Sequence, residues 1–398
     1  MNINEEIEKI WEETIKEELN KTRDTIINKH CEEIELKLDN FQKDLSGNIN
    51  EVFKIAEISS LKKKMNKITK NLIHEDDNNL INAILLCLSN IESFVFFCLS
   101  SEKNDILKKI NEINQNSYFS LITELMKNLW LKKEDINNLY NTLQIHHKLK
   151  NDFAFINTCK NPGKIIAFIL SQLNNEFNLN KNLNINNNIN RANKDEVLND
   201  FKKACDNNRN EITKEFFIDY QIKKKCKKYE EFEKYFYEQR PLITLYIQLD
   251  LKSSFNQIGN FNKISLKKNF NFLLNDNIDV EDDCEICEAR HAFIINNSIQ
   301  SLNNNILIIN IDREKDPSLN RKIKYPFNLE LTYKEDEKKE YKLISVLYKK
   351  EEKYVVYCKK LFNDNWIEYN EKEIKNVKNE NDVLNAEKVL LLIYKKID

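Results

Sequence analysis

Hydrophobic and polar positions follow different periods in the two halves of this chain. Between residues 1 and about 70, apolar side chains recur at helical spacing among lysines and glutamates, which predicts two or three long amphipathic helices. The apolar positions are Ile7, Ile10, Trp11, Ile15, Leu19, Ile34, Leu38, Phe41 and Leu45. These helices form either a partner-binding or coiled-coil arm, or a layer packed on the following domain, and the pattern leaves both interpretations open.

Two later segments are apolar nearly all round. Residues 80–99 predict a central helix buried on most faces, and residues 165–173 predict a second one that opens just after Pro162, a residue suited to a first helical turn. From residue 178 to about 193, asparagine alternates with leucine and isoleucine. Because asparagine side chains compete with backbone hydrogen bonding, this stretch predicts an inserted surface loop.

After about residue 240 the pattern changes to short apolar runs typical of strands. These runs are residues 243–249, 306–311, 341–347, 354–357 and 389–394. Helices first and strands later is an α+β order, which excludes a doubly wound parallel sheet. We therefore expect a carboxy-terminal half made largely of antiparallel sheet.

Composition narrows the function classes. A chain of 398 residues with 41% hydrophobic content can form one large domain with an extension, or two ordinary domains. The formal charge of -2 gives no reason to expect nucleic acid or an anionic membrane as partner. Three glycines in the whole chain exclude the glycine-rich loops that bind nucleotide phosphates. No apolar run approaches the roughly 20 residues that a membrane-spanning helix needs.

The nine cysteines suggest a reducing compartment. They are odd in number and scattered, and no secretory signal pattern accompanies them, so we expect free thiols rather than a disulfide framework. The sequence thus predicts a soluble protein of the cytoplasm or nucleus.

Six short segments in the second half of the chain match known strand motifs. Ile306–Arg313 resembles the strand written L-I-I-H-L-K-R-F, and Glu352–Tyr357 lies on the motif G-H-Y-V-A-Y. Four further segments match the motifs F-P-x-x-L-D-L, Y-x-L-x-A-V-I, W-Y-x-F-D and A-Y-x-L-F-Y: Tyr325–Leu331, Tyr341–Leu347, Trp366–Asn370 and Asn385–Tyr394. Six short matches in one order are far more specific together than any one alone, and in this order they resemble the strands of the ubiquitin-specific protease family.

The amino-terminal half agrees with this resemblance. Asn82–Asn90 resembles the tail of N-T-C-Y-M-N-A-x-L-Q-C-L, the helix that carries the family's nucleophile, and residues 161–176 resemble its D-A-x-E-F helix. The resemblance covers about 75–397. It implies an α+β, papain-like cysteine-protease fold over residues 71–398, with a helical thumb and an antiparallel palm and fingers, preceded by the helical extension 1–70.

The positions that carry the family's chemistry differ in this chain. A cysteine protease needs a thiolate, an imidazole beside it and a third group that orients the imidazole. The resemblance places Asn79 at the nucleophile, Lys353 at the histidine, Asn370 at the orienting residue and His74 at the oxyanion-stabilising asparagine. Loss of a nucleophile alone costs on the order of a millionfold in rate. The resemblance therefore implies a pseudoenzyme.

Two accessory sites differ as well. The Asp and Glu that line the family's channel for ubiquitin's basic tail are replaced by Asn161 and Lys164, which weakens charge-assisted capture of that tail. Of the family's two zinc-binding C-x-x-C pairs, Cys284 and Cys287 match the second, and only Cys226 remains of the first. We expect a metal-free hairpin; zinc held by these three thiols and a fourth donor such as His291 is the alternative.

Three functions stay open at this point. The leading prediction is a non-catalytic scaffold or interaction subunit with protein partners. The second is an active thiol-dependent hydrolase of ubiquitin or a ubiquitin-like protein, built on relocated residues such as Cys87 or Cys98 with His74, or Cys358 near the sheet. The third is a non-catalytic ubiquitin reader. The adjacent His146 and His147 should point to different faces of a helix and serve at the surface or as caps.

Overall fold

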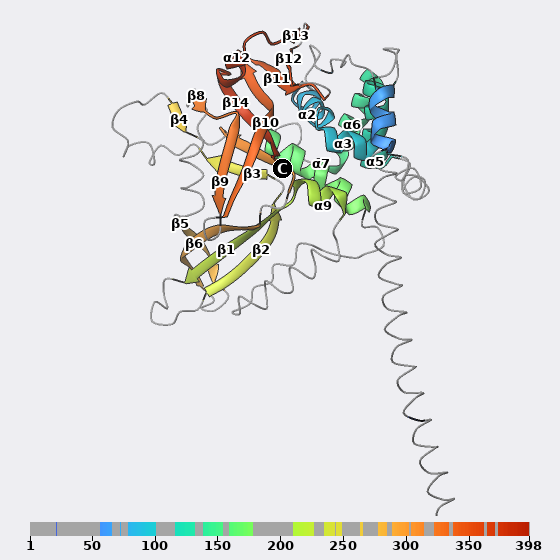
Figure 1. Ribbon diagram of the computed structural model, residues 1–398. Coiled ribbons are helices and arrows are strands. Elements are labelled where there is room, and N and C mark those ends of the chain that lie inside the picture. The colour runs from blue at the N-terminus through green and yellow to red at the C-terminus, as the bar shows by residue number, and fades with distance from the viewer. Residues whose placement is uncertain are drawn as a thin grey trace, which may run out of the picture. The chain divides into compact units, whose positions relative to one another are not determined.

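The computed structural model describes most of the chain after residue 78 (Figure 1). The described residues are 21, 56–65, 72, 79–100, 116–131, 138–153, 159–177, 210–226, 235–242, 244–248, 263–265, 278–284, 289–301, 304–313, 322–333, 337–361, 364–370 and 373–397. Only the backbone is described at residues 138–141, 211, 312, 332–333 and 337, and in the strands between residues 219 and 301.

The chain divides into two compact units, Met1–Lys64 and Met65–Asp398. In the first unit residues 56–64 are helical. The rest of the predicted amino-terminal helices, the predicted loop at 178–193 and His74 lie outside the described residues.

The second unit carries helices first and strands later. Its helices are α2 (Asn79–Ser89), α3 (Glu92–Leu99), α5 (Tyr118–Trp130), α6 (Asn138–Asp152), α7 (Pro162–Phe177), α9 (Glu211–Phe216) and α12 (Asn381–Leu384). Its strands are β1 (Ile218–Cys226), β2 (Tyr235–Leu242), β3 (Thr244–Gln248), β4 (Lys263–Ser265), β5 (Ile278–Cys284), β6 (Ala289–Ser301), β7 (Ile306–Asp312), β8 (Lys322–Lys324), β9 (Asn328–Tyr333), β10 (Glu337–Lys350), β11 (Lys353–Lys359), β12 (Trp366–Tyr369), β13 (Ile374–Asn376) and β14 (Lys388–Lys396). The five predicted strands and the α+β class are confirmed.

The apolar segment 80–99 is two helices, so the prediction of one continuous helix was wrong. The side chains of Ser89 and Asn90 donate hydrogen bonds to the carbonyl oxygen of Leu86, at 2.8 and 2.9 Å, and compete with helical bonding there. The indole nitrogen of Trp130 donates to the carbonyl of Ser89 at 3.0 Å and holds the break in place. The helix axes bend by 86° across it. Among the described helices no single one is long and apolar enough to cross a membrane. Helices α2 and α3 reach the necessary length and apolar composition only when the two are counted together across the bend.

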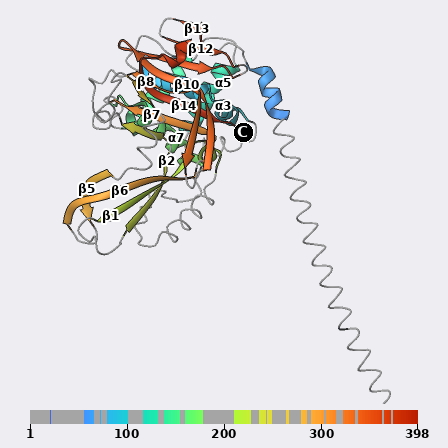
Figure 2. The ribbon, with the colours of Figure 1, turned by 60° about the vertical axis from the view of Figure 1, so that its left-hand side comes forward.

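The strands form three sheets (Figure 2). The largest has eight strands in the order β13-β12-β11-β10-β14-β7-β3, with β9 also paired to β10. A four-stranded sheet has the order β2-β1-β6-β5, and β4 pairs with β8. The pairings are antiparallel except β3 with β7 and β4 with β8. The largely antiparallel sheet predicted for the carboxy-terminal half is therefore confirmed.

Both faces of the large sheet are buried around β7 and β10. Leu307, Ile309 and Ile311 of β7 join one apolar cluster together with aromatic residues of β10, β12 and β14. The alternate residues of β7, which end with the buried Asn310, face α7. In β10 the register shifts between Leu343 and Ser345, and this bulge moves Ser345 to the face that α2 covers. Helix α2 thus lies in the core, where it packs against β10, β11, α3 and α7.

Candidate functional site

The predicted nucleophile helix and the predicted histidine strand pack against each other. Cys87 of α2 lies beside Cys358 of β11, whose sulfur is 3.2 Å from the hydroxyl of Ser345 on β10. All three side chains are fully buried, so this contact fixes how α2 sits along β11. The first residue of α2 is Asn79, and the first residue of β11 is Lys353. The two positions predicted to correspond to nucleophile and histidine are therefore the first residues of two elements that are packed together.

Neither of these two side chains offers the chemistry of its counterpart in a thiol protease. Asn79 is half-buried at the start of α2. Its carboxamide is not a nucleophile, unlike a thiolate. Lys353 is exposed at the start of β11. A lysine side chain has no imidazole ring, which is the group that takes the proton in a thiol protease.

Asn370 has a structural role after β12. Its side-chain oxygen accepts the N–H of Glu373 at 3.0 Å, and its side-chain nitrogen donates to the carboxylate of Glu368 at 3.0 Å. A backbone bond from Asn370 to the carbonyl of Glu373 closes the same turn. The residue that would orient an imidazole is thus engaged in the connection between β12 and β13.

Burial affects the thiols of Cys87 and Cys98 in the same way. Contact with Cys358 and burial both raise the pKa of Cys87 well above its usual range. Burial also raises the pKa of Cys98. Since the thiolate is the reactive form, both residues are held as inert thiols in the core.

Cys159 differs from the other cysteines whose side chains are described. Cys87, Cys98 and Cys358 are buried, whereas Cys159 is half-exposed in the segment just before α7, where its thiol donates to the carbonyl of Asn161 at 3.6 Å. It also interacts electrostatically with Tyr354 of β11. Cys159 could not be predicted as a site residue, because nothing in its local pattern indicates that the segment before α7 returns to the start of β11.

Asn161, at a predicted tail-channel position, immediately precedes α7. It is buried, and its side-chain oxygen accepts the N–H of Lys164 at 3.1 Å, as an N-cap residue does. Lys164 itself is exposed in the first turn. The N–H of Gly163 donates to the side-chain oxygen of Asn310 on β7 at 2.9 Å, which fixes the start of α7 on the sheet. The structure thus brings Asn161 and Lys164 to one helix start, where neither is a carboxylate.

The predicted zinc ligands lie on the four-stranded sheet, where only the backbone is described. Cys226 ends β1 opposite Phe293 of β6, and Cys284 ends β5 opposite Ala289 of the same strand. Phe293 and Ala289 are four positions apart on β6, or about 13 Å at the usual strand rise. Zinc held by Cys226, Cys284 and Cys287 therefore stays a prediction from the resemblance, as does the metal-free hairpin. Cys287 lies outside the described residues, and no group of potential metal ligands occurs among the described side chains.

His146 corrects one prediction. It is buried on α6, and its Nε2 atom lies 3.1 Å from the side-chain oxygen of Asn82 on α2. His147 on the next face is exposed. The two histidines do point to different faces, but the expected surface or capping role was wrong for His146, because a buried polar partner on α2 allows the ring to enter the core.

The fold and this arrangement define a mixed α+β protein of the ubiquitin-specific-protease type. The chain belongs to the ubiquitin carboxyl-terminal hydrolase family, whose sequence profile matches residues 77–394. A search of curated protein sequences gives no match.

Among solved structures, the chain is similar to chains of the SAGA DUB module. The Ubp8/Sgf11/Sus1/Sgf73 module bound to ubiquitin aldehyde matches with a TM-score of 0.56 and 15% identity, over 84% of this chain and 70% of that one. The yeast module with an altered Sgf73 matches with a TM-score of 0.56 and 16% identity, over 84% and 70%. A module bound to monoubiquitin matches with a TM-score of 0.56 and 15% identity, over 83% and 70%. At these identities the likeness shows the fold.

Proposed function

We propose that this chain is a catalytically inactive member of the family that acts as a scaffold or interaction subunit. One observation carries the proposal. The two elements that hold nucleophile and general base in a thiol hydrolase are packed together, yet they open with the carboxamide of Asn79 and the exposed ammonium of Lys353. The degenerate positions Asn370 and Asn161 have taken up turn and helix-capping bonds, which supports the same conclusion.

Weak binding of ubiquitin is a second role for the same fold. Two of the similar modules are bound to ubiquitin aldehyde and to monoubiquitin. We extend this to the present chain as a prediction that the globular body of ubiquitin, rather than its basic tail, would make the contacts. Metal-free fingers and a cytoplasmic or nuclear location belong to the same proposal.

The experiment that tests inactivity uses a ubiquitin probe with a thiol-reactive carboxy-terminal warhead. We expect no covalent adduct after prolonged incubation with the full chain, because the described thiols other than Cys159 are buried. An adduct that is abolished by Cys159→Ala would contradict the proposal and identify a relocated nucleophile. An adduct that survives this substitution would contradict it as well, and peptide mapping would locate the cysteine. Cys98→Ala, which removes a buried thiol instead of the half-exposed one, is the matched control for Cys159→Ala.

Titration with unmodified ubiquitin then separates scaffold from reader. A dissociation constant in the micromolar range, or about -8 kcal/mol of binding free energy, supports the reader. Absence of binding at millimolar ubiquitin leaves the scaffold role and removes the reader.

A further inference from the structure

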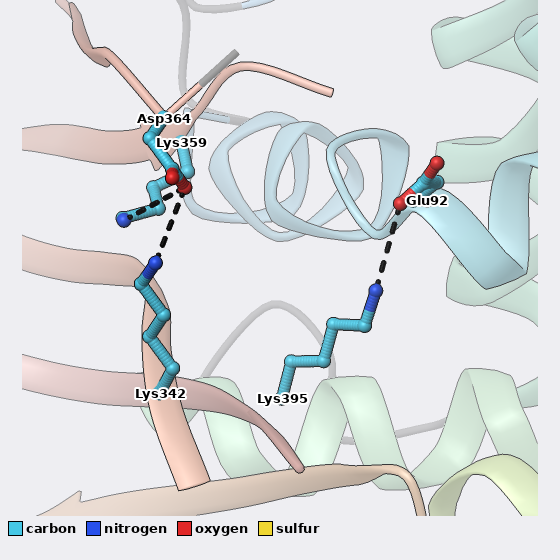
Figure 3. A network of polar contacts seen from close by, with 5 residues as sticks. All are labelled: Glu92, Lys342, Lys359, Asp364 and Lys395. Carbon is cyan, nitrogen blue, oxygen red and sulfur yellow. Dashed lines mark hydrogen bonds and ion pairs between the residues drawn. The ribbon is translucent and has the colours of Figure 1, made fainter. Parts of the chain in front are cut away.

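We draw no further inference here: the strongest candidate, the surface cluster in which Lys342 and Lys359 both reach the carboxylate of Asp364 at the end of β11 (Figure 3), carries nothing, because its ammonium groups already have that partner, at 3.3 and 3.2 Å, and nothing in the described part of the chain indicates a ligand that would replace it.

Discussion

The packed part of α2 and β11 and the first residues of these two elements have opposite character. In the packed part, which we call the inner end, Cys87, Cys358 and Ser345 are fully buried, and any change of size there alters the packing of helix on sheet. Among the first residues, which we call the outer end, Asn79 is half-buried and Lys353 is exposed. Substitutions at the outer end should therefore disturb the fold less than substitutions at the inner end.

The largest expected effect on stability comes from a substitution that forces a side chain into buried packing, at the contact of α7 with β7. A Cβ atom at Gly163 would lie 2.5 Å from the Cβ atom of Asn310, and that atom cannot move without the strand. We expect Gly163→Ala to reduce the free energy of unfolding by about 3 kcal/mol, measured by urea denaturation. Lys164→Ala, one residue along and exposed, should change it by less than about 0.5 kcal/mol. Equal effects of the two substitutions on the free energy of unfolding would contradict the distinction between buried and exposed positions.

The buried pair of Asn82 and His146 tests the same distinction with polar groups. Asn82→Ala leaves the imidazole Nε2 without its bond from α2, and should cost about 2 kcal/mol in the free energy of unfolding. The double variant Asn82→Ala, His146→Leu should recover part of this loss, since no orphaned polar group remains. A double variant less stable than the sum of the single variants would show that the imidazole has a further role in the core.

The carboxyl group of Glu176 allows buried and exposed positions to be compared through the pH dependence of stability. Its carboxylate accepts the N–H groups of Tyr118 and Phe119 at 2.7 and 2.8 Å, yet burial outweighs these bonds and raises its pKa above the ordinary value of 4.5. Because the folded-state pKa is raised, this group favours the folded state most below about pH 4.5, and the contribution is lost as pH rises through the raised pKa.

Glu176→Gln should therefore flatten the fall in stability over that pH range. It should also cost about 1 kcal/mol, since one acceptor oxygen remains for two N–H groups. Denaturation at a series of pH values measures both effects. Glu352→Gln at the exposed outer end is the control, and a similar flattening there would contradict the assignment to burial.

The elements of the fold also differ in how well the sequence predicted them. The strands at β7, β10, β11 and β14 were predictable because both their faces are buried and their apolar runs are continuous. The break after Ser89 was not, because it depends on side-chain bonds and on Trp130 from a distant helix. Strands β1 and β2 were also missed: β1 contains Lys223, Lys224 and Lys225 in a row and lacks a strand alternation.

For the site, the resemblance predicted the positions Asn79, Lys353, Asn370, Asn161 and Lys164, which stay predictions, and it did not predict the bonds that these residues make in this chain. The capping bond of Asn161 and the turn bonds of Asn370 are local and follow from ordinary asparagine chemistry. The nearness of Lys349 and Lys388 depends on the pairing of β10 with β14, and the nearness of Lys160 to them depends on the hydrogen bond between Gly163 and Asn310, two residues far apart in the sequence. Long-range register of this kind is not present in any local pattern.

The smallest effect is expected at the outer end itself. Glu351 is the first residue of the two-residue turn between β10 and β11 and has a φ of 56°, a conformation that favours glycine. We expect Glu351→Gly to raise the free energy of unfolding by about 0.5 kcal/mol, because relief of backbone strain exceeds the added entropy of the unfolded chain. Glu352→Gly, one residue on, should lower it by a similar amount. A lower free energy of unfolding for Glu351→Gly would show that relief of backbone strain does not exceed the added entropy of the unfolded chain.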